Sequence, residues 1–305
     1  MGKLKERLTA AQFAVSAEIG PPKGTDVGEM LRMADLLGPL VDAVNVTDQQ
    51  SAVMRLGSLP VSHLLAERGI EPVFQLTCRD RNRIALQSDL LSAYALGIEN
   101  VLCLTGDYVT LGDHPQAKPV FDLDSVSLLH AAATLRQGHD LAGKELLGAP
   151  DFYLGATVSP GAEPLEPQII KMERKVQAGA QFFQTQAVYD PERFARFMAD
   201  VRHLNVPVMA GIVLLKSAGM ARFMNRNVAG VHVPEPLIAE IDQAKNKRQK
   251  SVEIAARLIN ELKDVCQGVH IMAIGWEQLV PDVLVAAGLR EAAPAPASLK
   301  EVVPS

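Results

Sequence analysis

Five polar side chains follow short apolar runs, at the expected carboxyl ends of five different strands. They are Glu18, Thr47, Asp107, Gln186 and Lys216. A carboxylic acid that is partly removed from water at the end of an interior strand is suited to donating a proton near neutral pH. An aspartate and an amide can together hydrogen-bond the edge of a heterocyclic ring. In a (β/α)8 barrel such strand ends meet at one face, which is where catalysis takes place.

Each of these side chains also has an ordinary structural interpretation. Glu18 could pair with a lysine from a nearby loop, and a buried Gln186 could make hydrogen bonds that only hold the fold. Asp107 ends the sequence Thr105-Gly106-Asp107, which is common in turns. The glycine also lets the backbone approach a ligand closely. The chemistry therefore depends on whether these strand ends converge.

Two lysines and the lack of common motifs narrow the chemistry further. Lys171 and Lys175 are four residues apart, so they share a helix face that could bind phosphate or simply face water. No histidine, cysteine or acidic cluster has the spacing of metal ligands, and the sequence contains no GxSxG. We therefore expect neither a metal site nor a serine or cysteine nucleophile.

The elements that must position these residues show as alternating patterns along the chain. Apolar, β-branched runs predict strands at 14–19, 43–47, 71–77, 100–105, 152–158, 181–187, 207–214 and 269–275. Helical periodicity predicts helices at 26–37, 58–68, 82–96, 125–136, 166–179, 191–204, 217–226 and 277–287, with a further long helical region over roughly 235–266. Eight apolar strands, each followed by a helix, indicate a parallel sheet covered by helices.

The fold class expected from this alternation is α/β, as a (β/α)8 TIM barrel with eight parallel strands and outer helices. An open doubly wound sheet is the alternative, but it usually carries a glycine-rich phosphate loop after its first strand. Here that position reads Gly20-Pro21-Pro22-Lys23-Gly24, so we favour the barrel. We expect a single barrel domain at 1–290, an active-site loop at 107–122, and a Pro/Ala-rich tail at 291–305.

Composition argues against several classes of function. The 305 residues carry a net charge of −5 and no basic stripe, which argues against nucleic-acid binding. No apolar run is long enough to span a membrane, and the first residues lack the apolar segment of a signal peptide. The three cysteines form no paired motif, which is typical of a reducing compartment. We expect a soluble cytoplasmic protein without nucleic-acid or membrane partners.

Six short motifs follow the order of the predicted strands and extend over residues 13–290. They are Ser16-Ala17-Glu18 with Pro21-Pro22, Asn45-Val46-Thr47, Leu76-Thr77-Cys78, Leu104-Thr105-Gly106-Asp107, the run 173–180 (ERKVQAGA) and Gln184-Thr185-Gln186. In this order and spacing they resemble the 5,10-methylenetetrahydrofolate reductase family. The resemblance implies a flavin-containing (β/α)8 barrel that reduces 5,10-methylenetetrahydrofolate to 5-methyltetrahydrofolate.

The resemblance also implies roles for individual residues. Glu18 would be the general acid that protonates a folate nitrogen as the five-membered ring opens, before reduced flavin gives hydride to the exocyclic carbon. Asp107 would lie beside the flavin and bind the pterin, as a catalytic and substrate-binding residue. Gln186 and Lys216 would bind the folate. The flavin contacts that it implies are Thr47, Gln75, Thr105, Gly106, Asp107, Phe121, Lys171 and Lys175.

Several positions depart from the family pattern. Ala218 stands where an aromatic residue often stacks on NADH and folate, and Trp276 stands where an arginine is usual. These two changes argue against direct use of NADH. Gln75, Thr105 and Gln168 replace residues near the adenylate end of the flavin. FAD is the cofactor expected by family default, and these changes allow FMN instead.

The departures resemble the shorter reductases of acetogenic and other anaerobic bacteria. Those proteins receive electrons through a partner subunit that carries zinc or iron–sulfur centres. We therefore expect NADH or such a partner as electron donor, and either a homo-oligomer or a complex with that subunit. Two alternatives remain open: a pterin-binding barrel of methyltransferase type without redox chemistry, and a non-catalytic scaffold subunit.

Overall fold

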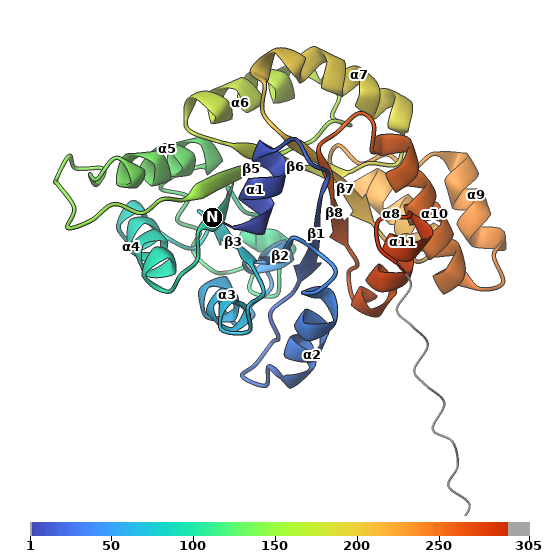
Figure 1. Cartoon of the computed structure of the whole chain (residues 1–305), viewed down its shortest axis with the longest axis horizontal. Helices are drawn as coiled ribbons and strands as arrows, with labels where there is room; N and C mark the ends of the chain where they lie inside the picture. Colours follow the sequence, from blue (N-terminus) through green and yellow to red (C-terminus); the bar gives the residue numbers. More distant parts are fainter. Residues whose placement is uncertain (1, 292–305) are drawn as a thin grey trace, which may run out of the picture.

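Eight parallel strands form a closed barrel in chain order, as Figure 1 shows for this computed structural model, which describes residues 2–291. The strands are β1 (Ala14–Ile19), β2 (Ala43–Val46), β3 (Pro72–Thr77), β4 (Asn100–Leu104), β5 (Tyr153–Val158), β6 (Phe182–Ala187), β7 (Val208–Val213) and β8 (Gly268–Met272). The predicted (β/α)8 barrel is thus confirmed.

The strands form where apolar runs can be buried on both faces. Every residue of β2, β3 and β7 is buried, as expected for parallel strands between a barrel interior and outer helices. Seven strands agree with their predicted bounds to within one residue at each end. The eighth prediction, 269–275, is wrong at its end. Ile274 and Gly275 have φ values of 50° and 82°, a left-handed backbone that a strand cannot continue.

The helices surround the barrel, and four short 3-10 segments lie in its connections. The α-helices are α1 (Lys3–Thr9), α2 (Gly28–Leu37), α3 (Ser58–Ala66), α4 (Arg83–Ala95), α5 (Ser125–Arg136), α6 (Glu166–Gln177), α7 (Pro191–Val201), α8 (Ala218–Asn227), α9 (Glu235–Gln243), α10 (Lys247–Leu262) and α11 (Val280–Ala286). The 3-10 segments are η1 (Gln50–Ala52), η2 (Val109–Leu111), η3 (Arg202–Leu204) and η4 (Glu277–Leu279).

The long helical region predicted over 235–266 is wrong as one element, because it is divided into α9 and α10. The Asn246 side chain accepts a hydrogen bond from the backbone N–H of Gln249 at 3.1 Å and so caps a new helix. An asparagine at this position satisfies a backbone donor that a continuous helix would bond internally. The other predicted helices are present, and that at 277–287 begins as η4.

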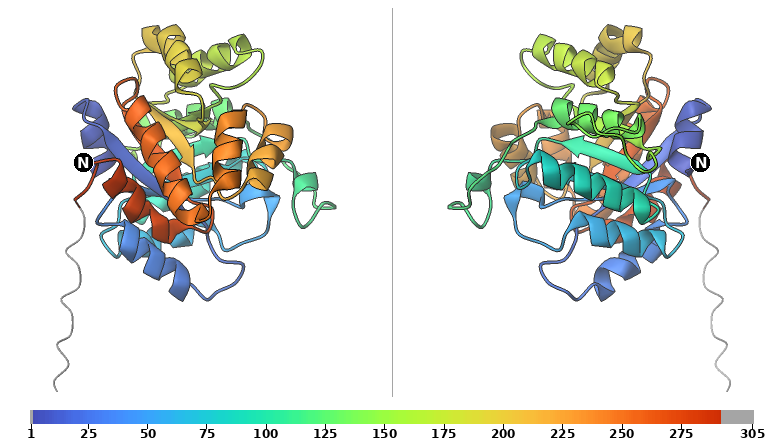
Figure 2. Two further views of the ribbon diagram at one scale, coloured as in Figure 1. Left: turned by 90° about the vertical axis from the view of Figure 1, so that its right-hand side faces the viewer. Right: turned by 90° about the vertical axis from the view of Figure 1, so that its left-hand side faces the viewer.

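Helix α1, which was not predicted, covers the amino-terminal end of the barrel. Its Leu4 and Leu8 are buried against residues that belong to the strands: Ala14, Ala43, Val73, Leu102, Tyr153, Phe182 and Met209. The rings of Tyr153 and Phe182 stack at 4.9 Å within this cluster. Figure 2 shows α1 and the loop after β4 at opposite ends of the barrel. The apolar interior thus fills the amino-terminal end and leaves the carboxyl end for a site.

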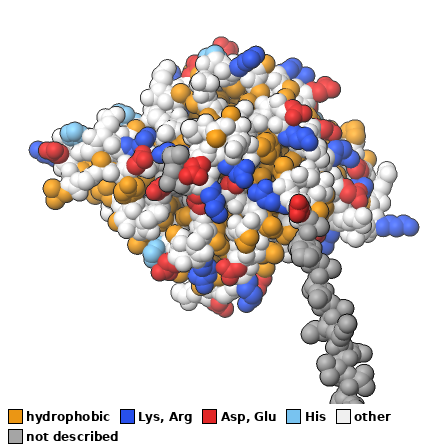
Figure 3. All heavy atoms as spheres, viewed as in Figure 1, with side chains coloured by type: hydrophobic (Ala, Val, Ile, Leu, Met, Phe, Trp, Pro, Cys, Tyr) orange, Lys and Arg blue, Asp and Glu red, His pale blue; other side chains and the backbone are white. Residues whose placement is uncertain are grey.

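The surface mixes charges of both signs. On the face that Figure 3 shows, acidic and basic side chains are interspersed among apolar ones. Within residues 2–291, none of the helices combines the length and the apolar character needed to cross a bilayer. The tail predicted at 291–305 lies outside the described residues from 292 onward.

Candidate active site

A cavity of about 530 Å³ opens at the carboxyl ends of the strands. It is lined by eight of the residues predicted for the site: Glu18, Gln75, Thr105, Gly106, Asp107, Lys171, Lys175 and Gln186. A cleft of about 910 Å³ beside α7 is larger, but the charged residues in its lining are Arg202 and Asp264. The kinds of side chain present, rather than the volume, make the first cavity the candidate active site.

Three predicted residues lie outside the lining of this cavity. Thr47 is buried, and its Oγ1 has no hydrogen-bond partner among the described residues. Phe121 is half-buried and meets the ring of Tyr108 edge-on at 6.0 Å. Lys216 donates to the backbone oxygen of Ile274, and its Nζ lies 5.2 Å from the ring centroid of Trp276. Of the five strand-end residues, the structure therefore brings together Glu18, Asp107 and Gln186.

Glu18 lies near the carboxyl end of β1, lines the cavity and has 11% of its side chain exposed. Its Oε1 accepts a hydrogen bond from Gln50 Nε2 at 3.4 Å, and its Oε2 accepts one from Gln75 Nε2 at 3.4 Å. His270 Nε2 lies 3.5 Å from the same Oε2. No lysine pairs with this carboxyl group among the described residues, so the loop-lysine interpretation is wrong. The environment consists of neutral N–H donors and one histidine.

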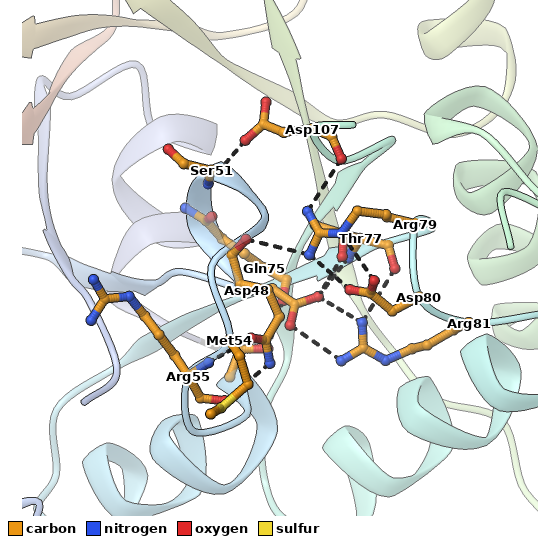
Figure 4. Close-up of polar contacts among 12 residues, drawn as sticks. Asp48, Ser51, Met54, Arg55, Gln75, Thr77, Arg79, Asp80, Arg81 and Asp107 are labelled. Carbon is orange, nitrogen blue, oxygen red and sulfur yellow. Dashed lines mark hydrogen bonds and ion pairs between the residues drawn. The ribbon is translucent and has the colours of Figure 1, made fainter. Parts of the chain in front are cut away.

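Asp107 follows β4 and points its carboxylate toward the loop after β2. Its Oδ2 accepts a hydrogen bond from the backbone N–H of Ser51 at 3.0 Å, as Figure 4 shows. Arg79 also links the loop after β2 to the loop after β4, because its guanidinium donates to the backbone oxygens of Asp107 and Gln49 at 3.4 and 3.3 Å. Gln49, Ser51 and Ala52 all have positive φ, which non-glycine residues adopt at a cost. This strained loop reaches both Asp107 and, through Gln50, Glu18.

Asp48 is buried beneath that loop and forms an ion pair with the half-buried Arg81, also drawn in Figure 4. Its Oδ2 accepts hydrogen bonds from Thr77 N at 2.9 Å, Thr77 Oγ1 at 2.8 Å and Arg81 Nη1 at 2.7 Å. Arg81 Nε also lies 2.8 Å from Asp89 Oδ2. These bonds compensate a carboxylate that would be costly to bury alone. The pair therefore fixes the carboxyl ends of β2 and β3 beside the cavity.

The two lysines of α6 differ in exposure. Lys171 is exposed, whereas Lys175 is only 5% exposed and donates to the backbone oxygen of Thr157 at 2.5 Å. The alternative of a fully solvated lysine face is thus wrong for Lys175. Burial, with the nearby charge of Lys171, lowers the pKa of Lys175 to about 8. A buried ammonium with one neutral acceptor is suited to receiving an anion.

Gly106 lets the backbone after β4 pass close to β3. Its φ is +95°, and a Cβ there would lie 3.1 Å from the Cβ atoms of Thr77 and Arg79. We expect Gly106→Ala to lower the free energy of unfolding by about 1–3 kcal/mol, because it adds backbone strain and crowding. Urea denaturation with an unchanged slope would measure this loss.

Gly143→Ala is the matched control for that substitution. Its φ is +77°, but nothing lies within 4 Å of where its Cβ would be. We expect it to cost about 1 kcal/mol from backbone strain alone. Equal losses for the two variants would contradict any contribution from crowding against Thr77 and Arg79.

Sequence reasoning missed several residues beside or beneath the cavity. They are Ser16, Asn45, Asp48, Arg79, Gln184 and His270. A signal existed for two of them, because Ser16 and Gln184 stand two positions before Glu18 and Gln186. Alternate residues of a strand point to the same face, so a polar residue at that spacing indicates a shared interior.

The cavity lining indicates proton transfer and ligand orientation rather than nucleophilic attack. Cys78, Cys103 and Cys266 are all buried, and burial raises the pKa of each thiol. Within residues 2–291, no three histidine, cysteine or acidic side chains gather as a potential metal-binding group. The cavity instead combines a glutamate, two aspartates, several amides, two lysines, an arginine and a histidine.

The chain is similar to several known proteins in sequence. The family model described as methylenetetrahydrofolate reductase matches residues 3–288. Methylenetetrahydrofolate reductase 2 of Schizosaccharomyces pombe is 26% identical over 94% of this chain and 47% of its own length. The 5,10-methylenetetrahydrofolate reductase of Pectobacterium carotovorum is 30% identical over 60% of this chain and 57% of its own length. The chain spans about half the length of these relatives.

A solved structure shares the fold across nearly the whole chain. It is that of an uncharacterized protein from Clostridium thermocellum that binds two copies of 5-methyl-5,6,7,8-tetrahydrofolic acid. Its TM-score is 0.65 at 16% identity, and the superposition covers 94% of this chain and 98% of that one. Identity at this level shows a common barrel architecture and no more.

Proposed function

The chain belongs to the methylenetetrahydrofolate reductase family, and we propose that it reduces 5,10-methylenetetrahydrofolate to 5-methyltetrahydrofolate with a bound flavin. The observation that carries the proposal is the presence of Glu18, Asp107 and Gln186 on one cavity that Lys171 and Lys175 also line. A pterin edge offers adjacent donors and acceptors, which an aspartate and an amide can bind together. The acid supplies the proton that ring opening requires.

The lysine side of the cavity fits a phosphorylated flavin. Lys175 is buried with its pKa lowered to about 8, so an incoming phosphate would stabilise its charged form. Gly106 allows close approach of a planar ring to the backbone, and Gln75 and Thr105 add polar groups to the lining. When bound, the flavin would supply hydride chemistry that no side chain provides. FAD is the family default, and FMN is compatible with Gln75, Thr105 and Gln168.

The proposed roles of the chain's own residues follow from their contacts. Glu18 gives its proton to a folate nitrogen as the five-membered ring opens. Gln186 and Asp107 hold the pterin, and Asp107 exchanges its bond with the Ser51 N–H for one with the substrate. The loop that carries Ser51 also carries Gln50, so binding at Asp107 and uncovering of Glu18 involve the same segment.

The proposed electron donor is NADH or a partner subunit with zinc or iron–sulfur centres. Ala218 begins α8 and is buried, and its methyl side chain has no ring on which a nicotinamide could stack. Trp276 lies under the cations of Lys216 and Arg248, at 5.2 and 5.6 Å from its ring centroid. These two positions support a partner subunit over direct reduction by NADH.

An anaerobic absorbance spectrum of the purified chain, with cofactor extraction, tests the proposal. NADH is added first and 5-methyltetrahydrofolate second, after reconstitution with FAD or FMN if needed. We expect a flavin band that the folate bleaches and NADH does not. Bleaching by both would support an NADH enzyme. Protein that binds folate but stays colourless after reconstitution would contradict the reductase and favour a pterin-binding barrel without redox chemistry.

A further inference from the structure

A chain of polar side chains crosses the barrel interior below the cavity. Asn45 Nδ2 donates to Gln184 Oε1 at 2.7 Å, and Gln184 Nε2 donates back to Asn45 Oδ1 at 3.1 Å. Gln184 Nε2 also donates to Ser16 Oγ at 3.3 Å, and Ser16 Oγ lies 2.9 Å from His270 Nδ1. All four side chains are buried, so these bonds form in surroundings of low dielectric constant.

The direction of this chain determines which nitrogen of His270 carries hydrogen. Ser16 Oγ accepts a hydrogen from Gln184, and among the described residues its other hydrogen-bond partner is Nδ1 of His270. The hydroxyl hydrogen therefore has an acceptor only if Nδ1 carries no hydrogen and accepts it. The neutral ring therefore carries its hydrogen on Nε2, the atom 3.5 Å from Glu18 Oε2. If the amide groups of Asn45 and Gln184 were both reversed, Ser16 would donate to Gln184 and accept from Nδ1 of His270. Nε2 would then carry no hydrogen, and its lone pair would face the Glu18 carboxylate, an electrostatically repulsive arrangement.

The same geometry makes the two oxygens of Glu18 unequal. Oε2 faces the N–H groups of His270 and Gln75, both from buried strand residues. Oε1 faces Gln50 Nε2, and Gln50 is an exposed residue of η1. Because Oε2 accepts a hydrogen bond from Gln75 and also has His270 Nε2 at 3.5 Å, the proton of a neutral carboxyl group is best placed on Oε1. An entering ligand can displace Gln50, whereas His270 and Gln75 are held by their strands.

We propose that His270 is a positioning residue that keeps the proton of Glu18 on Oε1, facing the folate nitrogen. Ser16, Gln184 and Asn45 fix the tautomer that allows this. In the step, the proton passes from Oε1 to the nitrogen, and the ring C–N bond breaks with its electron pair remaining on that nitrogen. The lone pair of the other folate nitrogen forms the iminium. The inference rests on the proposed function for its substrate, but the tautomer of His270 does not.

Nitrogen NMR of the full chain labelled with ¹⁵N-histidine tests the tautomer without substrate or cofactor. The His270 signals are assigned by their loss in His270→Gln. We expect an unprotonated Nδ1 and a protonated Nε2, and a shift toward mixed tautomers in Ser16→Ala. A ring protonated on Nδ1, whether neutral or charged, would overturn the inference. Signals unchanged in Ser16→Ala would overturn the role of the polar chain.

Two substitutions that differ by one methylene test the positioning role. The amide of His270→Gln reaches the place of Nε2 and can donate to Glu18, whereas that of His270→Asn reaches only as far as Ser16. We expect His270→Asn to slow folate turnover by about 10- to 100-fold with KM nearly unchanged, because the acid is misplaced. His270→Gln should recover most of that rate. His130→Gln, at an exposed position of α5, should match the parent chain.

The outcomes separate this inference from the proposed function. If His270→Asn turns over folate as fast as the parent chain while Glu18→Gln does not, the positioning role is overturned and the reductase stands. Equal losses for His270→Asn and His270→Gln would also overturn it, because a donor to Glu18 would then be of no use. If Glu18→Gln turns over normally, the acid role of Glu18 is wrong and the positioning role of His270 fails with it, while the reductase stands. The proposed function itself fails if the parent chain does not turn over the folate.

Discussion

Glu18→Gln is expected to slow the oxidation of reduced enzyme by 5,10-methylenetetrahydrofolate by about 10²- to 10⁴-fold, the usual contribution of a general acid. Glutamine keeps the shape of the side chain and can still bond Gln50 or Gln75, but it has no proton to transfer at neutral pH. Anaerobic stopped-flow absorbance of the flavin measures this half-reaction separately from reduction of the enzyme.

The control for this prediction is Glu192→Gln, which makes the same chemical change at an exposed position of α7. It should leave both half-reactions unchanged. The affinity of the Glu18 variant for flavin should equal that of the parent chain, because the lysine side of the cavity is untouched. An undiminished rate of folate-driven oxidation in Glu18→Gln would remove Glu18 from the chemistry.

Lys175→Met is expected to weaken flavin binding by about 10- to 150-fold, the value of a charge-assisted hydrogen bond to phosphate. The same change should stabilise the cofactor-free chain by about 1–2 kcal/mol near pH 7. This is the net effect of removing a buried charge and losing the hydrogen bond to Thr157. Folding lowers the pKa of this lysine to about 8 from 10.5, so the folded chain holds its charge at a cost. Equilibrium dialysis and urea denaturation measure the two effects.

The pH dependence of this effect has a definite sign. Below about pH 8 the lysine is charged in both states, and burial penalises the folded one. Between the folded pKa of about 8 and the unfolded value of 10.5, the unfolded chain binds more protons, so stability rises with pH. The advantage of Lys175→Met should therefore shrink over this window. A constant advantage, or an equal one for the exposed control Lys171→Met, would contradict a buried charge at Lys175.

The barrel could be predicted from the sequence because short, largely apolar runs alternate with helical patterns along the chain. The boundaries failed where one side chain or one backbone angle decides the structure. Asn246 divides α9 from α10 through a single cap, and the left-handed backbone at Ile274 keeps the chain from continuing as a strand beyond Met272. Such features cost or gain little free energy, so periodicity alone does not reveal them.

The candidate site was predictable in part for a similar reason. Glu18, Asp107 and Gln186 end strands that closure of the barrel brings together. The polar chain below them joins Ser16 to His270 across 254 positions, a distance that no local pattern spans. Thr47 shows where inference from the alternation of side chains along a strand fails. It stands two positions after Asn45 but lies beyond the end of β2, so alternation no longer fixes where it points.

Trp276 is the single tryptophan of the chain, and it lies after β8, at the end of the barrel where the cavity opens. The cations of Lys216 and Arg248 both lie over its indole ring, 5.2 and 5.6 Å from the ring centroid. Tryptophan fluorescence from this protein therefore originates at one place, in the loop that follows β8. A change around Lys216, Arg248 or the end of β8 would therefore alter a single fluorescence signal, which can be measured in the unlabelled protein.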